Sequence, residues 1–87
     1  MVVNNGNYIG ALVTFCIRQN LPRPEFFETQ PGRDVFLATV TFSYNGTFFY
    51  HEGVSRRKRV AKQLAAKKLW TGLQATMKSG GVNNAQK

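Results

Sequence analysis

The chain has 87 residues, 43% hydrophobic and 13% aromatic, which allows one small folded domain with a compact core. Its 12 Lys and Arg against 4 Asp and Glu give a formal net charge of +8. An anionic partner is therefore expected, with nucleic acid ahead of an anionic membrane or an acidic protein. The single cysteine, Cys16, excludes an intramolecular disulfide framework and a cysteine-based zinc site.

The sequence also restricts where the protein acts. No apolar run approaches the roughly 20 residues that a membrane span needs. The start, MVVNNGNYIG, lacks the basic and then hydrophobic layout of a signal peptide. Together with the single cysteine, this predicts an intracellular protein, nuclear or cytoplasmic, without a membrane partner.

The first predicted element is an amphipathic helix in NYIGALVTFCIRQN. Asn7 is a favoured N-cap residue, and apolar positions recur after it at spacings of three and four: Ile9, Leu12, Phe15 and Cys16. The two prolines of LPRP end this helix, because proline restricts both itself and the residue before it.

Three strands are predicted next. EFFETQ is read as a short strand, and PGRD has the composition of a turn. In DVFLATVTFSY, the residues Phe36, Ala38, Val40 and Phe42 form one side of an alternation with period two, as in a strand with one buried face. The dipeptide NG is a strong hairpin signal and leads into TFFYH as the third strand.

A long second helix closes the pattern. Gly53 is predicted to end the third strand and Ser55 to cap this helix. The core side of the helix would be formed by Ala61, Leu64, Ala65, Leu69 and Leu73. The element order predicts an α+β fold in two layers, a three-stranded antiparallel sheet with both helices packed on one face. Val35 and Leu37 would be apolar residues on the open face.

The predicted domain covers residues 7–75. Residues 1–6 and 76–87 are rich in Asn, Gly and other small or polar residues and lack apolar periodicity, so they are predicted to be flexible tails.

Basic residues are concentrated where the second helix begins, in SRRKRVAKQLAA. Lys62 follows Lys58 by four positions and Arg59 by three, so the charged groups of these residues are expected to project from one side of the helix. The free N–H groups and the positive dipole end of the helix would lie beside Arg56 and Arg57, which suits phosphate binding. A solvated basic face or a nuclear-localisation patch is the alternative reading of this run.

From Asn7 to Leu73 the chain resembles a double-stranded RNA-binding domain (dsRBD). NYIGAL is similar to the opening of that family, and LPRPEF to the Pro-Glu-Tyr that begins its first strand. KRVAKQLAA is similar to the family signature G-x-G-x-S-K-K-x-A-K-x-x-A-A, with matches at Lys58, Arg59, Ala61, Lys62, Ala65 and Ala66.

The resemblance implies recognition of duplex RNA by its shape, through phosphates and 2′-hydroxyls and with little sequence preference. It implies phosphate contacts from Arg56, Arg57, Lys58, Arg59 and Lys62. Minor-groove contacts would come from Thr14, Arg18 and Arg33. Thr14 stands where the family has Glu or Gln, and the turn at Arg33 lacks the usual Gly-Pro-x-His.

An enzyme is not expected. The four carboxylates are scattered, and His51, in a predicted loop, has no second ligand or nucleophile near it in sequence. The sequence therefore predicts no catalytic residue, metal site, cofactor or small-molecule substrate, and any activity would belong to a larger parent protein.

Three alternatives to general duplex binding remain open. The domain could be a protein-interaction or dimerisation module with weak or no RNA binding, using the open sheet face or the second helix at Leu69, Trp70 and Leu73. It could be a ribonucleoprotein component that binds one structured RNA. The aromatics of TFFYH could stack on bases, although either Phe48 or Phe49 must face the core.

Overall fold

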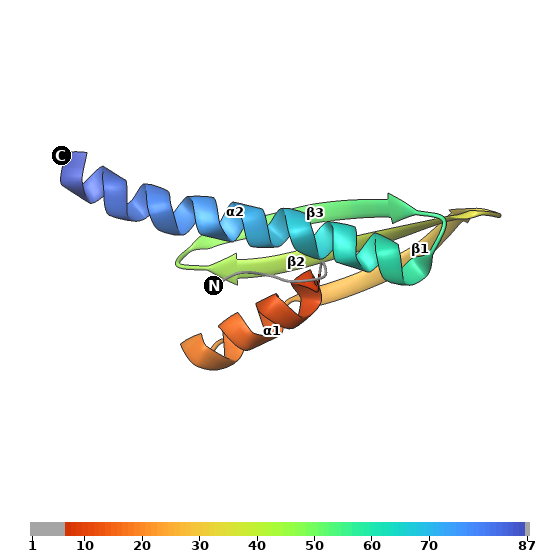
Figure 1. The fold of residues 1–87 in the computed structure, drawn as a ribbon, viewed down its shortest axis with the longest axis horizontal. Helices are drawn as coiled ribbons and strands as arrows, with labels where there is room; N and C mark the ends of the chain where they lie inside the picture. Colours follow the sequence, from red (N-terminus) through yellow and green to blue (C-terminus); the bar gives the residue numbers. More distant parts are fainter. Residues whose placement is uncertain (1–6, 87) are drawn as a thin grey trace.

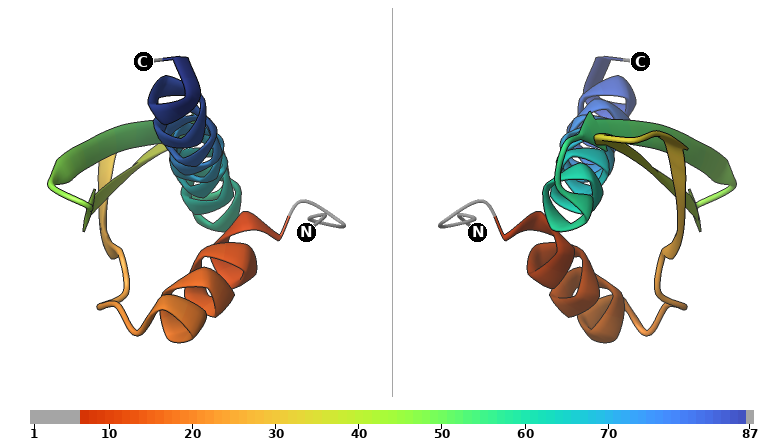
Figure 2. Two further views of the ribbon diagram at one scale, coloured as in Figure 1. Left: turned by 90° about the vertical axis from the view of Figure 1, so that its left-hand side faces the viewer. Right: turned by 90° about the vertical axis from the view of Figure 1, so that its right-hand side faces the viewer.

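The computed structural model describes residues 7–86, with side chains through residue 77. Its elements are α1 (Tyr8–Gln19), β1 (Glu25–Gly32), β2 (Val35–Tyr44), β3 (Thr47–Ser55) and α2 (Lys58–Gln86) (Figure 1). The strands form one antiparallel sheet in the order β1-β2-β3. Figure 2 shows both helices on the same side of this sheet, which confirms the predicted α+β architecture.

Both ends of α1 are defined by asparagines. The side chain of Asn7 caps the start, its Oδ1 accepting a hydrogen bond from the Gly10 N–H at 3.0 Å, as the sequence predicts. Asn20 ends the helix in the left-handed conformation, with φ of 60°. Between them, Leu12 and Cys16 are fully buried against the core.

The sheet follows the predicted alternation, but its outer strands, β1 and β3, are longer than predicted. Ala38, Val40 and Phe42 of β2 are buried, and the NG turn has both residues at positive φ. However, β1 continues to Gly32, and β3 continues to Ser55. The prediction that the third strand ends at Gly53 is therefore wrong, and the turn between β1 and β2 contains only residues 33–34.

Gly53 is where α2 lies closest to the sheet. A Cβ atom at this position would overlap the Ala61 carbonyl oxygen and would lie 2.6 Å from the Ala65 nitrogen. In the sheet, Gly53 pairs with Ala38, whose side chain is also small and fully buried. A glycine at this point of β3 thus allows the helix backbone to approach, and it does not interrupt the strand.

The buried side of α2 differs in part from the prediction. Leu64 is 38% exposed, so its assignment to the core is wrong, whereas Ala66 and Trp70 are buried. Trp70 packs edge-to-face on Phe15 of α1 at a centroid distance of 6.1 Å. Phe15 also packs on Tyr44 of β2 at 5.5 Å, so the aromatic rings join α1, α2 and the sheet.

The ends of α2 also differ from the prediction. The helix begins at Lys58 and not near Ser55, because residues 56 and 57 form a bend after β3. It continues as helix to Gln86, past the end of the sheet, through residues 76–86 that were predicted as part of a tail (Figure 1). This part of the helix contains Gly80 and Gly81, and glycine lowers helix stability by less than proline does. The boundary at residue 75 stays a prediction, and residues 1–6 lie outside the described part.

We expect Gly53→Ala to lower the free energy of unfolding by about 3 kcal/mol, because the added methyl group overlaps the backbone of α2. Gly72→Ala is the matched control. Its added Cβ would lie 3.5 Å or more from its neighbours, so the better helix propensity of alanine should raise stability by about 0.5–1 kcal/mol. Urea unfolding of both variants measures the difference, and equal effects would contradict the close packing at Gly53.

Candidate nucleic-acid interface

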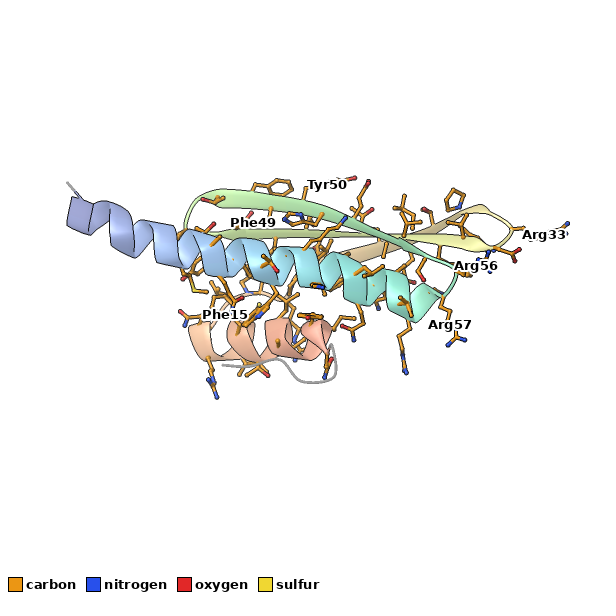
Figure 3. All side chains as sticks on the ribbon, turned by 45° about the horizontal axis from the view of Figure 1, so that its top comes forward. Phe15, Arg33, Phe49, Tyr50, Arg56 and Arg57 are labelled. Carbon is orange, nitrogen blue, oxygen red and sulfur yellow. The ribbon has the colours of Figure 1, made fainter. Side chains whose placement is uncertain are left out.

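Three arginines lie at one end of the molecule. Arg56 and Arg57 occupy the bend before α2, Arg33 lies in the turn between β1 and β2, and all three are exposed (Figure 3). The Arg57 N–H donates to the Ser55 Oγ at 3.2 Å, and the Gln30 side chain donates to the Arg33 carbonyl at 2.8 Å. Local hydrogen bonds therefore fix the backbone on which these arginines are carried.

The start of α2 lies beside this arginine cluster. Ala61 donates the first hydrogen bond of the helix, to the Arg57 carbonyl at 2.9 Å, so the N–H groups before Ala61 have no carbonyl of an earlier turn to bind. The first turn of α2 contains no acidic residue. These N–H groups and the helix dipole favour an anion at this end.

A groove runs beside the first two turns of α2. It has a volume of about 790 Å³ and is lined by Asn7, Ile9, Glu28, Lys58, Arg59, Lys62 and Gln63. The three basic residues that the sequence places on one side of the helix therefore share one groove. Their role in phosphate binding stays a prediction.

The groove also contains an acidic residue. Glu28 of β1 forms ion pairs with Lys58 and Lys62, each at 3.4 Å. The Lys62 ammonium lies in addition 5.5 Å from the centre of the Phe26 ring. The sequence alone does not reveal this role of Glu28, because Lys58 and Lys62 are distant in the chain and only the register of β1 shows which side of the sheet Glu28 faces.

The opposite wall of the groove connects the two helices. The Gln63 Oε1 accepts hydrogen bonds from the Tyr8 N–H at 2.8 Å and the Ile9 N–H at 3.2 Å. Asn7 satisfies the N–H of Gly10 by its side chain and that of Ala11 by its carbonyl. The three N–H groups of Tyr8, Ile9 and Gly10, which precede the first helix hydrogen bond of α1, are thereby all bonded, two of them by a residue of α2.

The predicted minor-groove residues are not all close to this groove. Thr14 and Arg18 do not line it, and Arg18 lies in the last turn of α1. That end of α1 points away from the start of α2 (Figure 1). Arg33 is at the same end of the molecule as Arg56 and Arg57 (Figure 3). Contacts of all three predicted residues with RNA stay predictions.

His51 lies within β3, in agreement with the predicted TFFYH strand, and its assignment to the loop after that strand is wrong. Its Nε2 would be 3.5 Å from a Cβ at Gly72, so the imidazole lies between the sheet and α2. Burial, and secondarily the charge of Lys68, lowers the pKa of His51 below 6.5, which favours the neutral ring at pH 7.

The described residues also bear on metal-binding and membrane-spanning classes of protein. They contain no group of three or more His, Cys, Asp or Glu arranged to hold a metal ion. None of the described helices is long and apolar enough to cross a membrane.

The α-β-β-β-α order, the sheet covered on one face, and a basic groove at the start of the second helix define a small nucleic-acid-binding domain. The family model of the double-stranded RNA binding motif matches residues 8–73. The chain therefore belongs to this family, which confirms the resemblance and supports double-stranded RNA as a partner. The family is a binding domain and not a catalytic one. A comparison with curated proteins finds no match.

Gln63 is predicted to hold α1 in place through its side-chain oxygen. Gln63→Leu leaves two partly buried N–H groups of α1 without an acceptor and should lower the free energy of unfolding by about 1–2 kcal/mol. Gln63→Glu keeps an acceptor and should preserve most of this stability. Urea unfolding, together with amide exchange at Tyr8 and Ile9, measures both. Equal loss in the two variants would contradict the capping role.

Proposed function

We propose that the domain binds double-stranded RNA by its shape, through phosphate and 2′-OH contacts that are largely independent of sequence, as a module of a larger intracellular RNA-associated protein. The observation that carries this proposal is the basic surface at the start of α2. It combines exposed Arg56, Arg57 and Arg59 with the free N–H groups at the N-terminal end of α2.

The shape of A-form RNA explains why such a surface suits a duplex. The major groove is too deep and narrow for side chains to read, but the phosphates on its edges are accessible. Guanidinium groups can bind phosphate oxygens with two parallel hydrogen bonds. Contacts of this kind position the protein without reading bases, so little sequence preference is expected.

Arg59→Ala should weaken binding to an RNA duplex of about 20 base pairs by roughly threefold to tenfold, equally for duplexes of different sequence. The slope of the logarithm of the binding constant against the logarithm of the salt concentration should become shallower by about one unit, because one phosphate contact is lost. Lys58→Ala and Lys62→Ala should act in the same direction. Fluorescence anisotropy at several salt concentrations measures this, with a DNA duplex of the same sequence beside it.

Lys68→Ala is the matched control, since it removes one charge from another exposed position on α2. If Arg59→Ala and Lys68→Ala bind RNA equally, the proposed surface is wrong. If RNA and DNA duplexes bind equally, and only through the start of α2, the surface is a general phosphate patch.

A second candidate function is association with another copy of this chain through the open sheet face. Apolar side chains on that face are well exposed, Phe27 at 56%, Tyr50 at 55% and Val54 at 55%. Val35 and Leu37, which were predicted to mark this face, are half-buried. The alternative surface on α2 is less suitable, because Leu69, Trp70 and Leu73 are buried in the core.

If this second function holds, sedimentation equilibrium should show a mass that increases with protein concentration, and Phe27→Ser and Val54→Ser should reduce it. Ile17→Ser is the control, because Ile17 is 64% exposed on α1 and distant from the sheet face. A monomer at every concentration, or an equal effect of all three variants, would exclude the sheet face as an interface.

A further inference from the structure

One carboxylate lies within the basic groove. Glu28 places its Oε1 3.4 Å from the Lys58 Nζ and its Oε2 3.4 Å from the Lys62 Nζ. Each carboxylate oxygen thus pairs with a different lysine, and both lysines belong to the phosphate surface proposed above. The same groove contains Arg59, for which the described residues show no ion pair within 4.0 Å.

The register of the sheet explains this position. Glu28 pairs with Ala38, and Ala38 pairs with Gly53, so these three residues form one row across the sheet on the face that α2 covers. Close packing of α2 at Gly53 brings the first turns of the helix near β1. Lys58 and Lys62 are four positions apart, so both face the same way and one carboxylate can bridge them.

The arrangement is present before any ligand binds. Glu28 is held by the backbone pairing of β1 with β2, and its side chain is only 26% exposed. Lys62 is 36% exposed and also contacts the Phe26 ring. A phosphate that approaches Lys58 or Lys62 therefore meets a carboxylate that is already paired with that lysine.

We propose that Glu28 is an internal competitor of the RNA phosphates, which weakens the contributions of Lys58 and Lys62 and leaves Arg56, Arg57 and Arg59 as the stronger phosphate contacts. The two lysines and Glu28 together present one net positive charge in place of two. Phosphate must either displace the carboxylate or bind beside it at the cost of like-charge repulsion. This inference rests on the proposed RNA-binding function.

The test compares two glutamates of β1. Glu28→Gln should tighten binding to the 20-base-pair RNA duplex by roughly threefold to tenfold and should steepen the salt dependence by up to about one unit. Glu25→Gln is the matched control. Glu25 is exposed on the same strand but pairs with Thr41 on the opposite face of the sheet, so it changes the net charge equally without touching the groove.

A second comparison tests whether the lysines carry the effect. In a Lys58→Gln, Lys62→Gln background, Glu28→Gln should change affinity no more than Glu25→Gln does, because the residues that Glu28 masks are gone. Urea unfolding checks that the variants fold, and Glu28→Met provides a second uncharged replacement of similar volume.

The outcomes separate this inference from the function on which it rests. Tighter binding by Glu28→Gln that disappears in the Lys58→Gln, Lys62→Gln background supports the competitor role. If the parent binds RNA and Glu28→Gln binds equally or more weakly, the competitor role is wrong and RNA binding stands. If neither the parent nor Glu28→Gln binds duplex RNA, both proposals are wrong.

Discussion

The close packing of α2 on the sheet at Gly53 is the constraint on which the rest of the structure depends. Ala38, Ala61 and Ala65 are buried around it, and their small side chains allow the helix backbone to contact the strands. This contact sets the distance between α2 and the sheet and the rotation of α2 about its own axis. The rotation directs Lys58 and Lys62 toward β1, and the short distance brings both side chains within reach of Glu28. The shape of the basic groove thus follows from packing between small apolar residues.

Local signals in the sequence predicted most of the fold. The cap at Asn7, the alternation in β2 and the NG turn are short-range features, and each one specifies its element without a distant partner. Gly53 and Leu64 were misread because their environments depend on a contact between elements. A glycine in a strand reads as a break unless a helix backbone is known to cross it. Leu64 matches a helical period and its Cβ lies close to Gly53, but the residue is 38% exposed, whereas Ala66 and Trp70 are buried.

In the candidate site, too, the sequence predicted the features that depend on local spacing and missed those that depend on contacts between elements. The spacing of Lys58, Arg59 and Lys62 placed them on one side of a helix, and they do line one groove. Glu28 and Gln63 could not be found this way, because their partners are distant in the sequence; the hydrogen bond from Tyr8 to Gln63 spans 55 positions. Such residues become visible only once the register of β1 and the packing of α1 on α2 are known.

The net charge of +8 therefore overstates how much positive charge is available to an anion at the basic groove. Salt dependence reports the counterions released when cations meet phosphates, and a lysine already paired with a carboxylate has fewer to release. The proposed interface contains two kinds of cation. Arg56 and Arg57 are exposed at the open end of α2, whereas Lys58 and Lys62 share the charge of Glu28. In the proposed complex, packing at Gly53 sets the shape of the groove, whereas Glu28 and the basic residues set its charge, so one can change while the other stays constant.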